Sequence, residues 1–488
     1  MRTILSKHDL RHLELLEFLI KNKHQWTLLK TISNHLATPL RTLQNDIQEI
    51  NVYIHPLTIQ SSSSGIKMAI PKNCSERYVY KKILEASIDF QLIEYVFMHE
   101  GETLQSLAET FHLSESTIKR MIKKINESFQ DEEFSIQSTP VSFIGEEALI
   151  NQFMSCYFYE KYFFPEEYLT KNEINLILKL INKTLNDLGK DLYFPNFKRV
   201  FTRVHLNCVR LRNKHDIPLI PGRFFSNDIL NDNQFCSEFF ETFQLQLTPL
   251  IIQKLFHIFS YSDYFFSIEE LHNKILINEQ QNILYNELKN VLSNISNQFN
   301  IPLKSSIENK LLLDLVNIIN LRDRYCHHLF ILYNQKGRFL SQLSKNYNYV
   351  SDMIKTHLIS NISLEFNESD WNELNYILLT HWTDLYEKFR FIETPIQIFL
   401  VIDTDMEHGF LIKRELETYS RFNIQVEVMT DPLLTQLQLL TKDQVLITNI
   451  PTITHINCEL LCFEEFLGNQ EWQMLDDIFK RIIANRKN

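Results

Sequence analysis

Two short stretches of the chain place polar and basic side chains at the spacing of one helix face. The first carries Arg41, Gln44, Asn45 and Gln48 at positions i, i+3, i+4 and i+7, and the second has a similar series 75 residues later. Arg, Asn and Gln can hydrogen-bond to base edges of DNA, while Lys and Arg neutralise phosphates. We therefore predict DNA contacts from Arg41, Thr42, Gln44, Asn45, Gln48, Ser116, Thr117, Lys119, Arg120, Lys123 and Lys124.

The second stretch is the more basic of the two. Residues 114–126 contain four basic residues and one acidic residue, whereas in residues 38–51 Arg41 is outweighed by Asp46 and Glu49. A basic helix face is often only solvated, and a single such helix leaves that interpretation open. We expect the second helix to supply more of the affinity for DNA, because phosphate contacts dominate that affinity.

An internal repeat predicts the elements that position both stretches. Residues 28–51 and 103–126 align without a gap at an offset of 75, and their core-like positions coincide, as Leu43 and Ile118 do. The apolar spacing in each copy predicts two packed helices separated by a short turn. This pattern is typical of a helix-turn-helix unit, here present twice.

Local signals mark where these helices begin and where each pair ends. Pro39 predicts the first helical position of the second helix in one copy, and Ser114 predicts the N-cap in the other. An alternating segment comes after each helix pair, at 57–70 and at 134–145, and consists of two β-patterned runs joined by a turn. We interpret these segments as wings, so two winged helix-turn-helix domains are predicted.

The composition limits what the whole chain can be. Eight glycines in 488 residues disfavour barrels, propellers and dinucleotide-binding loops and favour a mainly α, multidomain protein. A net charge of −11 means that DNA contacts depend on local patches. The seven cysteines lack metal-ligand spacing, and neither a signal-peptide core nor a membrane-spanning run is present. We expect a cytoplasmic protein that is not an enzyme and holds no metal or cofactor.

The rest of the chain changes character twice. Residues 151–390 show long helical periodicity with few breakers, which predicts helix bundles. Within them, residues 206–214 resemble residues 316–324 at an offset of 110, so two copies of one helical module are expected. Residues 395–488 alternate strand-like and helix-like runs, which predicts a small, mainly parallel α/β sheet.

This order of parts resembles the Mga/AtxA-like family of transcriptional virulence regulators of Gram-positive bacteria, which contain phosphotransferase-system regulation domains (PRD). The most recognisable segments are SLAETFHLSESTIKRMIKKIN and IQSTPVSFIGEE. The resemblance implies five domains: a winged helix-turn-helix at 1–70, a second of Mga type at 71–150, PRD-like helical domains at 151–275 and 276–390, and an α/β domain similar to the EIIB component at 391–488.

The same resemblance implies control by histidine phosphorylation. His205 matches the first family histidine, and His257 and His272 are both open as a second one. A phosphoryl group adds about −1.5 to −2 charge, enough to reset a helical interface. The gapless repeat puts Leu315 at the position equivalent to His205, so the second module departs from the family pattern. Residues 403–408, where an EIIB component carries a phosphorylated cysteine, are acidic and contain no cysteine.

The leading hypothesis is a DNA-binding transcriptional regulator that acts as a homodimer or higher oligomer. Its expected partners are double-stranded DNA of promoter regions and phosphotransferase-system phosphocarrier proteins. Two alternatives stay open. An RNA-binding antiterminator would share the regulation domains but begin with a small β-rich domain, and a phosphotransferase-system carrier component would need the missing cysteine.

Overall fold

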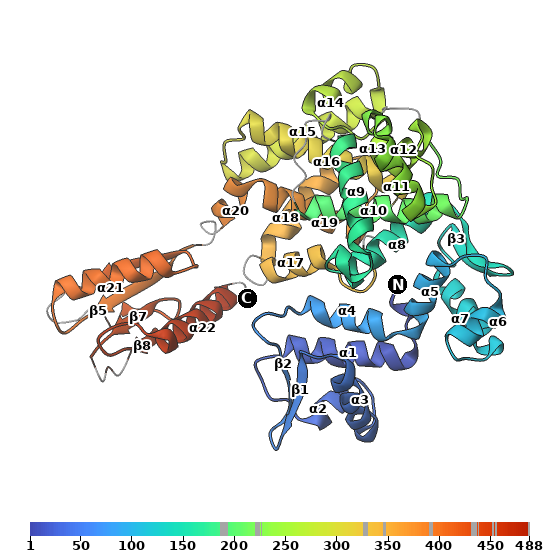
Figure 1. The fold of residues 1–488 in the computed structure, drawn as a ribbon. Coiled ribbons are helices and arrows are strands. Elements are labelled where there is room, and N and C mark those ends of the chain that lie inside the picture. Colours follow the sequence, from blue (N-terminus) through green and yellow to red (C-terminus); the bar gives the residue numbers. More distant parts are fainter. Residues whose placement is uncertain are drawn as a thin grey trace. The chain divides into compact units, whose positions relative to one another are not determined.

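The computed structural model describes residues 1–185, 194–219, 225, 227–325, 330–344, 348–389, 394–430, 437, 439–450, 453 and 456–486. The chain is mainly helical (Figure 1). Its contacts divide it into two compact units. One comprises Met1–Asn286, Leu312–Gln342 and Ser363–Leu374, and the other comprises Glu287–Leu311, Leu343–Ile362 and Asn375–Asn488.

The first unit begins with a helix-turn-helix copy followed by a hairpin. A short 3-10 turn, Arg2–Ile4, precedes helix α1, whose N-cap Ser6 accepts a hydrogen bond from the backbone N–H of Asp9 at 3.0 Å. The elements of this first copy are α1 (Lys7–Lys21), α2 (Leu29–His35), α3 (Leu40–Tyr53), β1 (Thr58–Ser62) and β2 (Gly65–Ala69). The strands β1 and β2 pair antiparallel, as the predicted wing requires.

The second copy repeats this order with one more helix in front. Its elements are α4 (Arg77–Ala86), α5 (Ile88–Met98), α6 (Leu104–Thr110), α7 (Glu115–Ser128), β3 (Phe134–Ser138) and β4 (Val141–Gly145). Strands β3 and β4 also form an antiparallel pair. The two helix pairs predicted from the repeat, and the hairpin after each, are therefore present.

The turns inside the two helix pairs have the same geometry. Ala37 and His112, which are 75 residues apart, both adopt positive φ, at 47° and 53°. Few residues other than glycine do so, and here the conformation ends the first helix of each pair sharply. Pro39 lies one position earlier than predicted, because it is the N-cap of α3 with an extended ψ of 143° and Leu40 is the first helical residue. Ser114 is the N-cap of α7, as predicted.

Both wings are tied to the start of the first helix of their pair. The backbone groups of Thr27 and Ile66 exchange two hydrogen bonds, at 3.0 and 2.9 Å, and Glu102 bridges to Val141 in the second copy. Gly65 allows the first of these approaches, because a Cβ there would lie 2.2 Å from the carbonyl oxygen of Thr27. In each domain, the residue just before the first helix of the pair thus adds a short third strand to the two-stranded wing.

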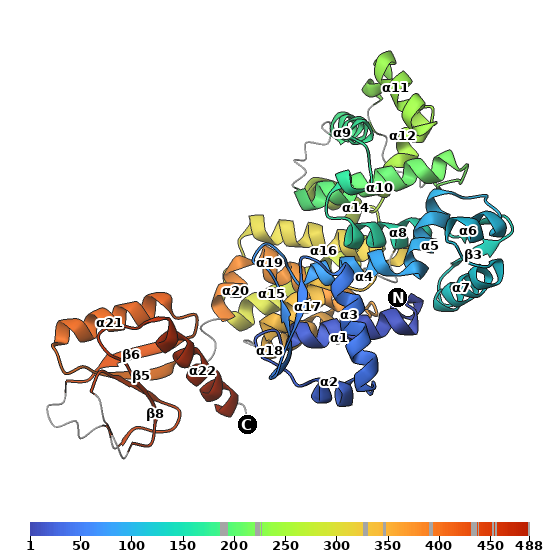
Figure 2. The same ribbon diagram turned by 60° about the horizontal axis from the view of Figure 1, so that its bottom comes forward.

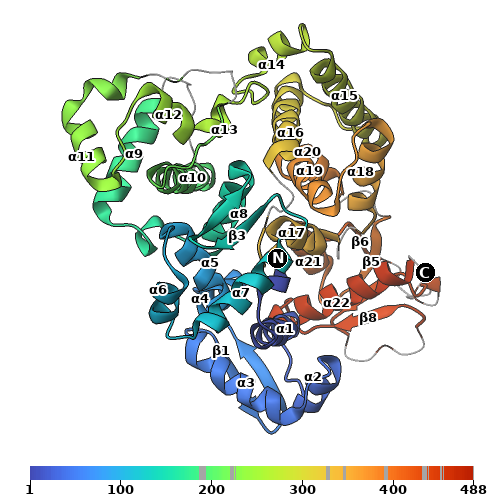
Figure 3. The same ribbon diagram turned by 90° about the vertical axis from the view of Figure 1, so that its right-hand side faces the viewer.

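Helices fill the middle of the chain, as predicted for residues 151–390. Helix α10 carries residues 206–212 of the weaker repeat and packs against α9, α11 and α12 around it (Figure 3). The helices are α8 (Glu147–Lys161), α9 (Lys171–Leu185), α10 (Phe194–Arg212), α11 (Asn233–Phe243), α12 (Pro249–Leu255), α13 (His257–Ser260), α14 (Ile268–Ile275), α15 (Glu279–Phe299), α16 (Ser305–Tyr325), α17 (Gln335–Ser344), α18 (Asn348–Asn361), α19 (Glu368–His381) and α20 (Thr383–Phe389), with 3-10 turns at Pro165–Glu167 and Asp228–Asn231.

The C-terminal segment is a parallel α/β sheet, which confirms the predicted class for this part (Figure 2). Its four strands lie in the order β6-β5-β7-β8 and all pair in parallel. Ile398 and Leu400 of β5, one of the two inner strands, face α21 and α22, while Phe399 and Val401 pack with Leu437 and Leu440 on the other side. The elements are β5 (Ile396–Val401), α21 (Met406–Tyr419), β6 (Ile424–Val428), β7 (Val445–Thr448), β8 (Glu459–Cys462) and α22 (Asn469–Arg486).

Candidate nucleic-acid interface

The exposed face of α7 presents three cations. Lys119, Arg120 and Lys123 are all exposed to solvent. Arg120 lies along its own helix, with long hydrogen bonds of 3.4 Å to the carbonyl oxygen of Ser116 and the hydroxyl of Thr117. Lys123 lies 3.9 Å from Glu127, and because this pair is solvent-exposed it holds the ammonium group only weakly. Arg120 and Lys123 can therefore exchange these weak contacts for phosphate oxygens, and Lys119 is exposed beside them.

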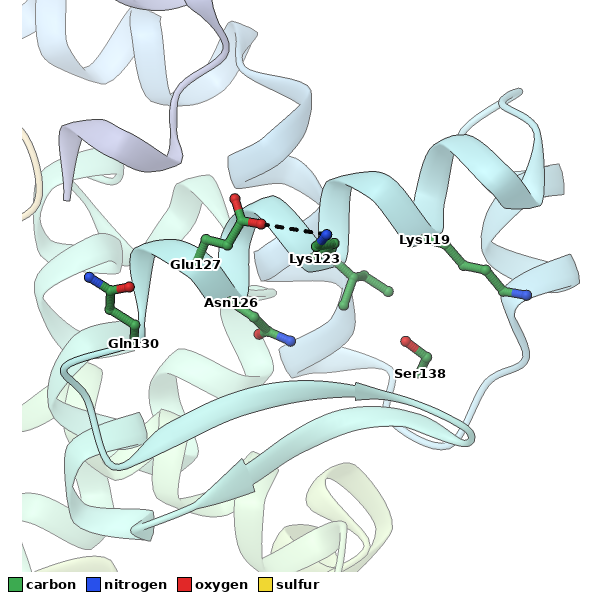
Figure 4. A pocket seen from close by; sticks show the side chains of 7 residues that line it. Lys119, Lys123, Asn126, Glu127, Gln130 and Ser138 are labelled. Atoms are coloured by element: carbon green, nitrogen blue, oxygen red, sulfur yellow. Dashed lines mark ion pairs between the residues drawn. The ribbon is translucent and has the colours of Figure 1, made fainter.

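A groove of about 460 Å³ runs between α7 and the wing (Figure 4). Lys119 and Lys123 line its helix side, and Ser138 at the end of β3 lines the other. The remaining lining residues are Ile122, Asn126, Glu127 and Gln130. The groove thus combines two ammonium groups with the amide of Gln130 and the hydroxyl of Ser138, groups of the kind that bind the phosphates and sugars of DNA. It also contains the carboxylate of Glu127, the exposed partner of Lys123.

Lys124 lies on another side of α7. Its ammonium group donates to the carboxylate of Asp89 at 2.8 Å and to the carbonyl oxygen of Ile4 at 2.7 Å. Burial raises the pKa of Asp89, and the Lys124 charge opposes that rise. The structure therefore places this predicted DNA contact between α7, α5 and the N-terminal turn, apart from the exposed face.

Ser116 and Thr117, the two hydroxyl residues of α7 that are predicted to contact DNA, both lie beside the N-cap Ser114. Ser114 accepts a hydrogen bond from the backbone N–H of Thr117 at 3.2 Å, and its hydroxyl lies 2.8 Å from that of Ser116. Ser116 is exposed and Thr117 is half-buried. These hydroxyls surround the positive end of the helix dipole, which attracts anions.

The exposed face of α3 is polar and carries one cation. Arg41, Gln44, Asn45 and Gln48 are exposed, as the spacing predicted, and Thr42 is half-buried. Amide side chains of this kind suit base edges better than phosphates. The face therefore differs from that of α7 in chemistry as well as in charge.

Asp46 does not belong to that exposed face, although its charge was set against that of Arg41 when residues 38–51 were compared with residues 114–126. It is buried, and Arg11 of α1 donates to both of its oxygens at 2.6 and 2.7 Å. Burial alone would raise the pKa of Asp46, but the hydrogen bonds and charge of Arg11 bring it below its ordinary value. The ionised carboxylate is thus neutralised within the domain.

One asparagine in each copy holds the wing against the second helix. Asn51 donates to the carbonyl oxygen of Ile59 at 3.0 Å and accepts from its N–H at 2.7 Å. Asn126 makes the same two bonds with Ile136, both at 2.8 Å. Sequence reasoning did not single out these two residues, although their matching positions at an offset of 75 were visible in the repeat.

A buried charge network joins the second wing to the helical region. Arg210 of α10 is fully buried and donates to both oxygens of Glu147 at 2.5 and 2.8 Å. It also bonds to Glu100, which accepts from the backbone N–H of Phe143 in β4 at 3.0 Å and pairs with His215. Removing one member would leave a buried charge without its partner, which is costly. The network therefore links α10 to the backbone of the second wing.

The three candidate phosphorylation sites have different environments. His205 is buried against the rings of Phe158 and Tyr168, and neither of its ring nitrogens has a hydrogen-bond partner among the described residues. Burial lowers the pKa of His205 to about 4 and that of His257 to about 3, so both imidazoles are neutral. His272 is exposed, with its Nε2 3.2 Å from the hydroxyl of Tyr285. His272 is thus accessible from solvent, whereas His205 and His257 are buried.

None of the helices that the structure describes is long and apolar enough to span a bilayer.

Comparisons with known proteins match both helix-turn-helix copies. Residues 6–65 match the family described as M protein trans-acting positive regulator (MGA) HTH domain, and residues 72–158 match the Mga helix-turn-helix domain. These segments cover the elements from α1 to the start of β2 and from before α4 to most of α8.

Three relatives extend the similarity beyond these domains. A Streptococcus pneumoniae serotype 4 protein, provisionally named a trans-acting regulator, is 25% identical over 88% of this chain and 89% of its own length. The anthrax toxin expression trans-acting positive regulator of Bacillus anthracis is 26% identical over 47% of this chain and 48% of its own. The capsule synthesis positive regulator AcpA of Bacillus anthracis is 22% identical over 62% and 65%. Both helix-turn-helix copies are therefore of the Mga type, and over most of its length the chain is similar to a protein named as a trans-acting regulator.

Proposed function

We propose that the chain is a transcriptional regulator that binds double-stranded promoter DNA through its two winged helix-turn-helix domains. The observation that carries the proposal is the exposed cationic face of α7 beside the wing groove, with Lys119 and Lys123 on the groove wall. The two Bacillus anthracis relatives are named positive regulators, which favours activation of transcription. The protein would act in the cytoplasm, without enzymatic activity of its own.

The charges predict a division of work between the two domains. Each phosphate that a cation neutralises releases counterions and makes binding depend on salt. The face of α7 offers three cations and the face of α3 offers Arg41, so α7 supplies most of the non-specific affinity and α3 most of the base contacts. With a net charge of −11, the whole chain binds non-specific DNA weakly, and paired subunits raise occupancy.

For the remaining domains we propose PRD-like helical domains at 151–275 and 276–390 and an EIIB-like α/β domain at 391–488, following the winged domains at 1–70 and 71–150. The α/β domain is our candidate for self-association into a homodimer. Its helix α21 exposes Met406, Phe410 and Leu411, each about half accessible to solvent, and an exposed apolar surface of this kind favours a symmetric interface.

Phosphorylation by phosphotransferase-system carriers is the proposed control, with His205, His257 or His272 as acceptor. The neutral imidazoles of His205 and His257 suit a nucleophile. Because His205 lies on α10, five residues before Arg210, a phosphoryl group there would disturb the helix that carries the charge network to the second wing.

The test is genome-wide occupancy of the full chain, measured together with transcripts in wild-type, deletion and variant strains. We expect the chain upstream of genes whose transcripts change on deletion. Changing Lys119, Arg120 and Lys123 together to Ala should remove most of that occupancy while the protein level stays the same. Promoter occupancy that survives this triple change would contradict the assignment of α7.

A further inference from the structure

Two histidines and a glutamate meet between α1 and α3 of the first helix-turn-helix copy. His8 and His12 are one helical turn apart on α1, and Glu49 reaches them from α3. The Nε2 atom of His8 lies 2.8 Å from the Oε2 atom of Glu49, and the Nε2 atom of His12 lies 4.0 Å from the same oxygen. One ligand atom from each residue falls within 4.8 Å of the other two.

This spacing suits a tetrahedral cation. Ligands about 2.0–2.2 Å from a zinc ion are roughly 3.3–3.5 Å from one another, and the observed 2.8 and 4.0 Å lie on either side of that value. Small rotations close the difference, because the side chains of His8 and Glu49 are 48% and 55% exposed. His12 is only 2% exposed and supplies a fixed ligand.

The hydrogen-bond partners of His12 orient its ring for binding a cation through Nε2. Its Nδ1 atom lies 3.1 Å from the hydroxyl of Tyr53, while its Nε2 atom faces the cluster. Without a cation, the Nε2–H group can donate to the ionised Asp46. A cation bound at Nε2 would move the proton to Nδ1, which then donates a hydrogen bond to the Tyr53 hydroxyl, an arrangement typical of metal-bound histidines. Asp46 lies 3.3 Å from the same Nε2 atom and is held by Arg11, so its carboxylate lies beside the three proposed ligands without being one of them.

We propose that His8, His12 and Glu49 form a binding site for a divalent transition cation of the Zn²⁺ or Co²⁺ type. Two imidazoles and one carboxylate suit such ions, whereas Mg²⁺ and Ca²⁺ prefer oxygen ligands throughout. No metal site was predicted from the sequence, because the cysteines lack metal-ligand spacing; the signal that marks this site is the i, i+4 pair of His8 and His12.

The cation would clamp α1 to the helix that carries the polar DNA-facing stripe. It would also neutralise Glu49, which adjoins Gln48 and lies one helical turn beyond Asn45. This consequence for DNA rests on the proposed function, but the cation site itself does not.

The test is titration of the full chain with Co²⁺ and Zn²⁺, comparing wild type with His8→Ala and Glu49→Gln. Both changed residues are exposed, so the fold should survive, and circular dichroism checks that it does. His24→Ala is the matched control, because His24 is an exposed histidine of the same domain outside the cluster. We expect one visible Co²⁺ band, a rise in melting temperature with Zn²⁺, and affinity about tenfold or more weaker in both variants but unchanged in the control.

Either of two results would overturn the site. One is wild-type affinity retained in both His8→Ala and Glu49→Gln, and the other is a near-ultraviolet thiolate band, which would assign the cation to cysteine. The titration uses no DNA, so its failure would leave the proposed regulatory function untouched, and failure of promoter binding would leave the cation site untouched.

Discussion

In the first helix-turn-helix copy His12 and Glu49 approach each other between two helices, and in the second copy Asp89 and Lys124 do so at the corresponding place. The buried positions of α1 recur in α5 at an offset of 77, so that Leu13 matches Phe90 and His12 matches Asp89. Glu49 matches Lys124 at the offset of 75. The acidic partner has changed helices between the two copies.

This difference shows which part of the domain is constrained by packing. The apolar positions of α3 and α7 that fill the two cores are buried in both copies, as Leu43 and Ile118 are. The charged positions at the edge of those cores pair between neighbouring helices, and the two copies place the acidic partner on different helices. In the second copy, Lys124 forms an ion pair with Asp89 and the exposed face of α7 is cationic. In the first copy, Glu49 lies in a cluster with His8 and His12 and the exposed face of α3 is polar.

The largest expected effect concerns the two exposed faces. Changing Lys119, Arg120 and Lys123 to Ala should weaken binding of a promoter duplex about 100-fold at ~0.1 M salt and lower the salt slope by about three, since each phosphate contact contributes about one. The matched variant on α3, with Arg41, Gln44 and Gln48 changed to Ala, should lower the slope by about one. Fluorescence anisotropy across a salt series measures both, and equal slopes would break the comparison.

A smaller effect separates the two lysines of α7. Lys124→Met should lower the free energy of unfolding by about 2 kcal/mol, because Asp89 would keep a buried charge without its cation. The salt slope for DNA should not change. Lys119→Met is the matched control and should do the reverse, with the slope lower and the stability unaltered. Urea unfolding and anisotropy measure the two quantities, and a loss of slope in Lys124→Met would return this residue to the DNA-facing set.

The smallest effect concerns the asparagine that holds the wing in both copies. Asn51→Ala and Asn126→Ala each remove two hydrogen bonds between a helix and its wing, so each should lower stability by about 1–2 kcal/mol. Hydrogen exchange should rise in the strands of the affected wing alone. If one substitution has no effect on its wing, the two wings are held differently despite their matching contacts.

Much of the architecture was predictable because it depends on local periodicity. The helix pairs, the hairpins at 58–69 and 134–145, and the parallel C-terminal sheet all appear as predicted. Helix spacing also gave the exposed positions of α3, including Gln44 and Gln48, since burial on an amphipathic helix repeats with the helical turn. Pro39 was misplaced by a single residue, which is the scale on which helix ends vary.

Periodicity could not say where residues at the border of a helix face point. Lys124 lies beside the buried Ile125, and only the position of Asp89 and of the N-terminal turn decides that its charge faces inward. His205 likewise fits the pattern of an amphipathic helix, but the rings of Phe158 and Tyr168 enclose it. The contacts of Lys124 join segments 35 to 120 residues apart in the chain, and no local pattern encodes them.

The sequence by itself determined the duplicated helix-turn-helix units, their wings, the helical middle and the polar and basic character of α3 and α7. These features depend on which residues recur at a helical or strand spacing. The tertiary structure decided which charges are neutralised inside the domains, as Asp46 and Lys124 are, and which remain exposed, as Lys119 and Lys123 do. It also decided that His8, His12 and Glu49 meet, because the distance between two charged groups depends on how separate helices pack and not on their separation along the chain.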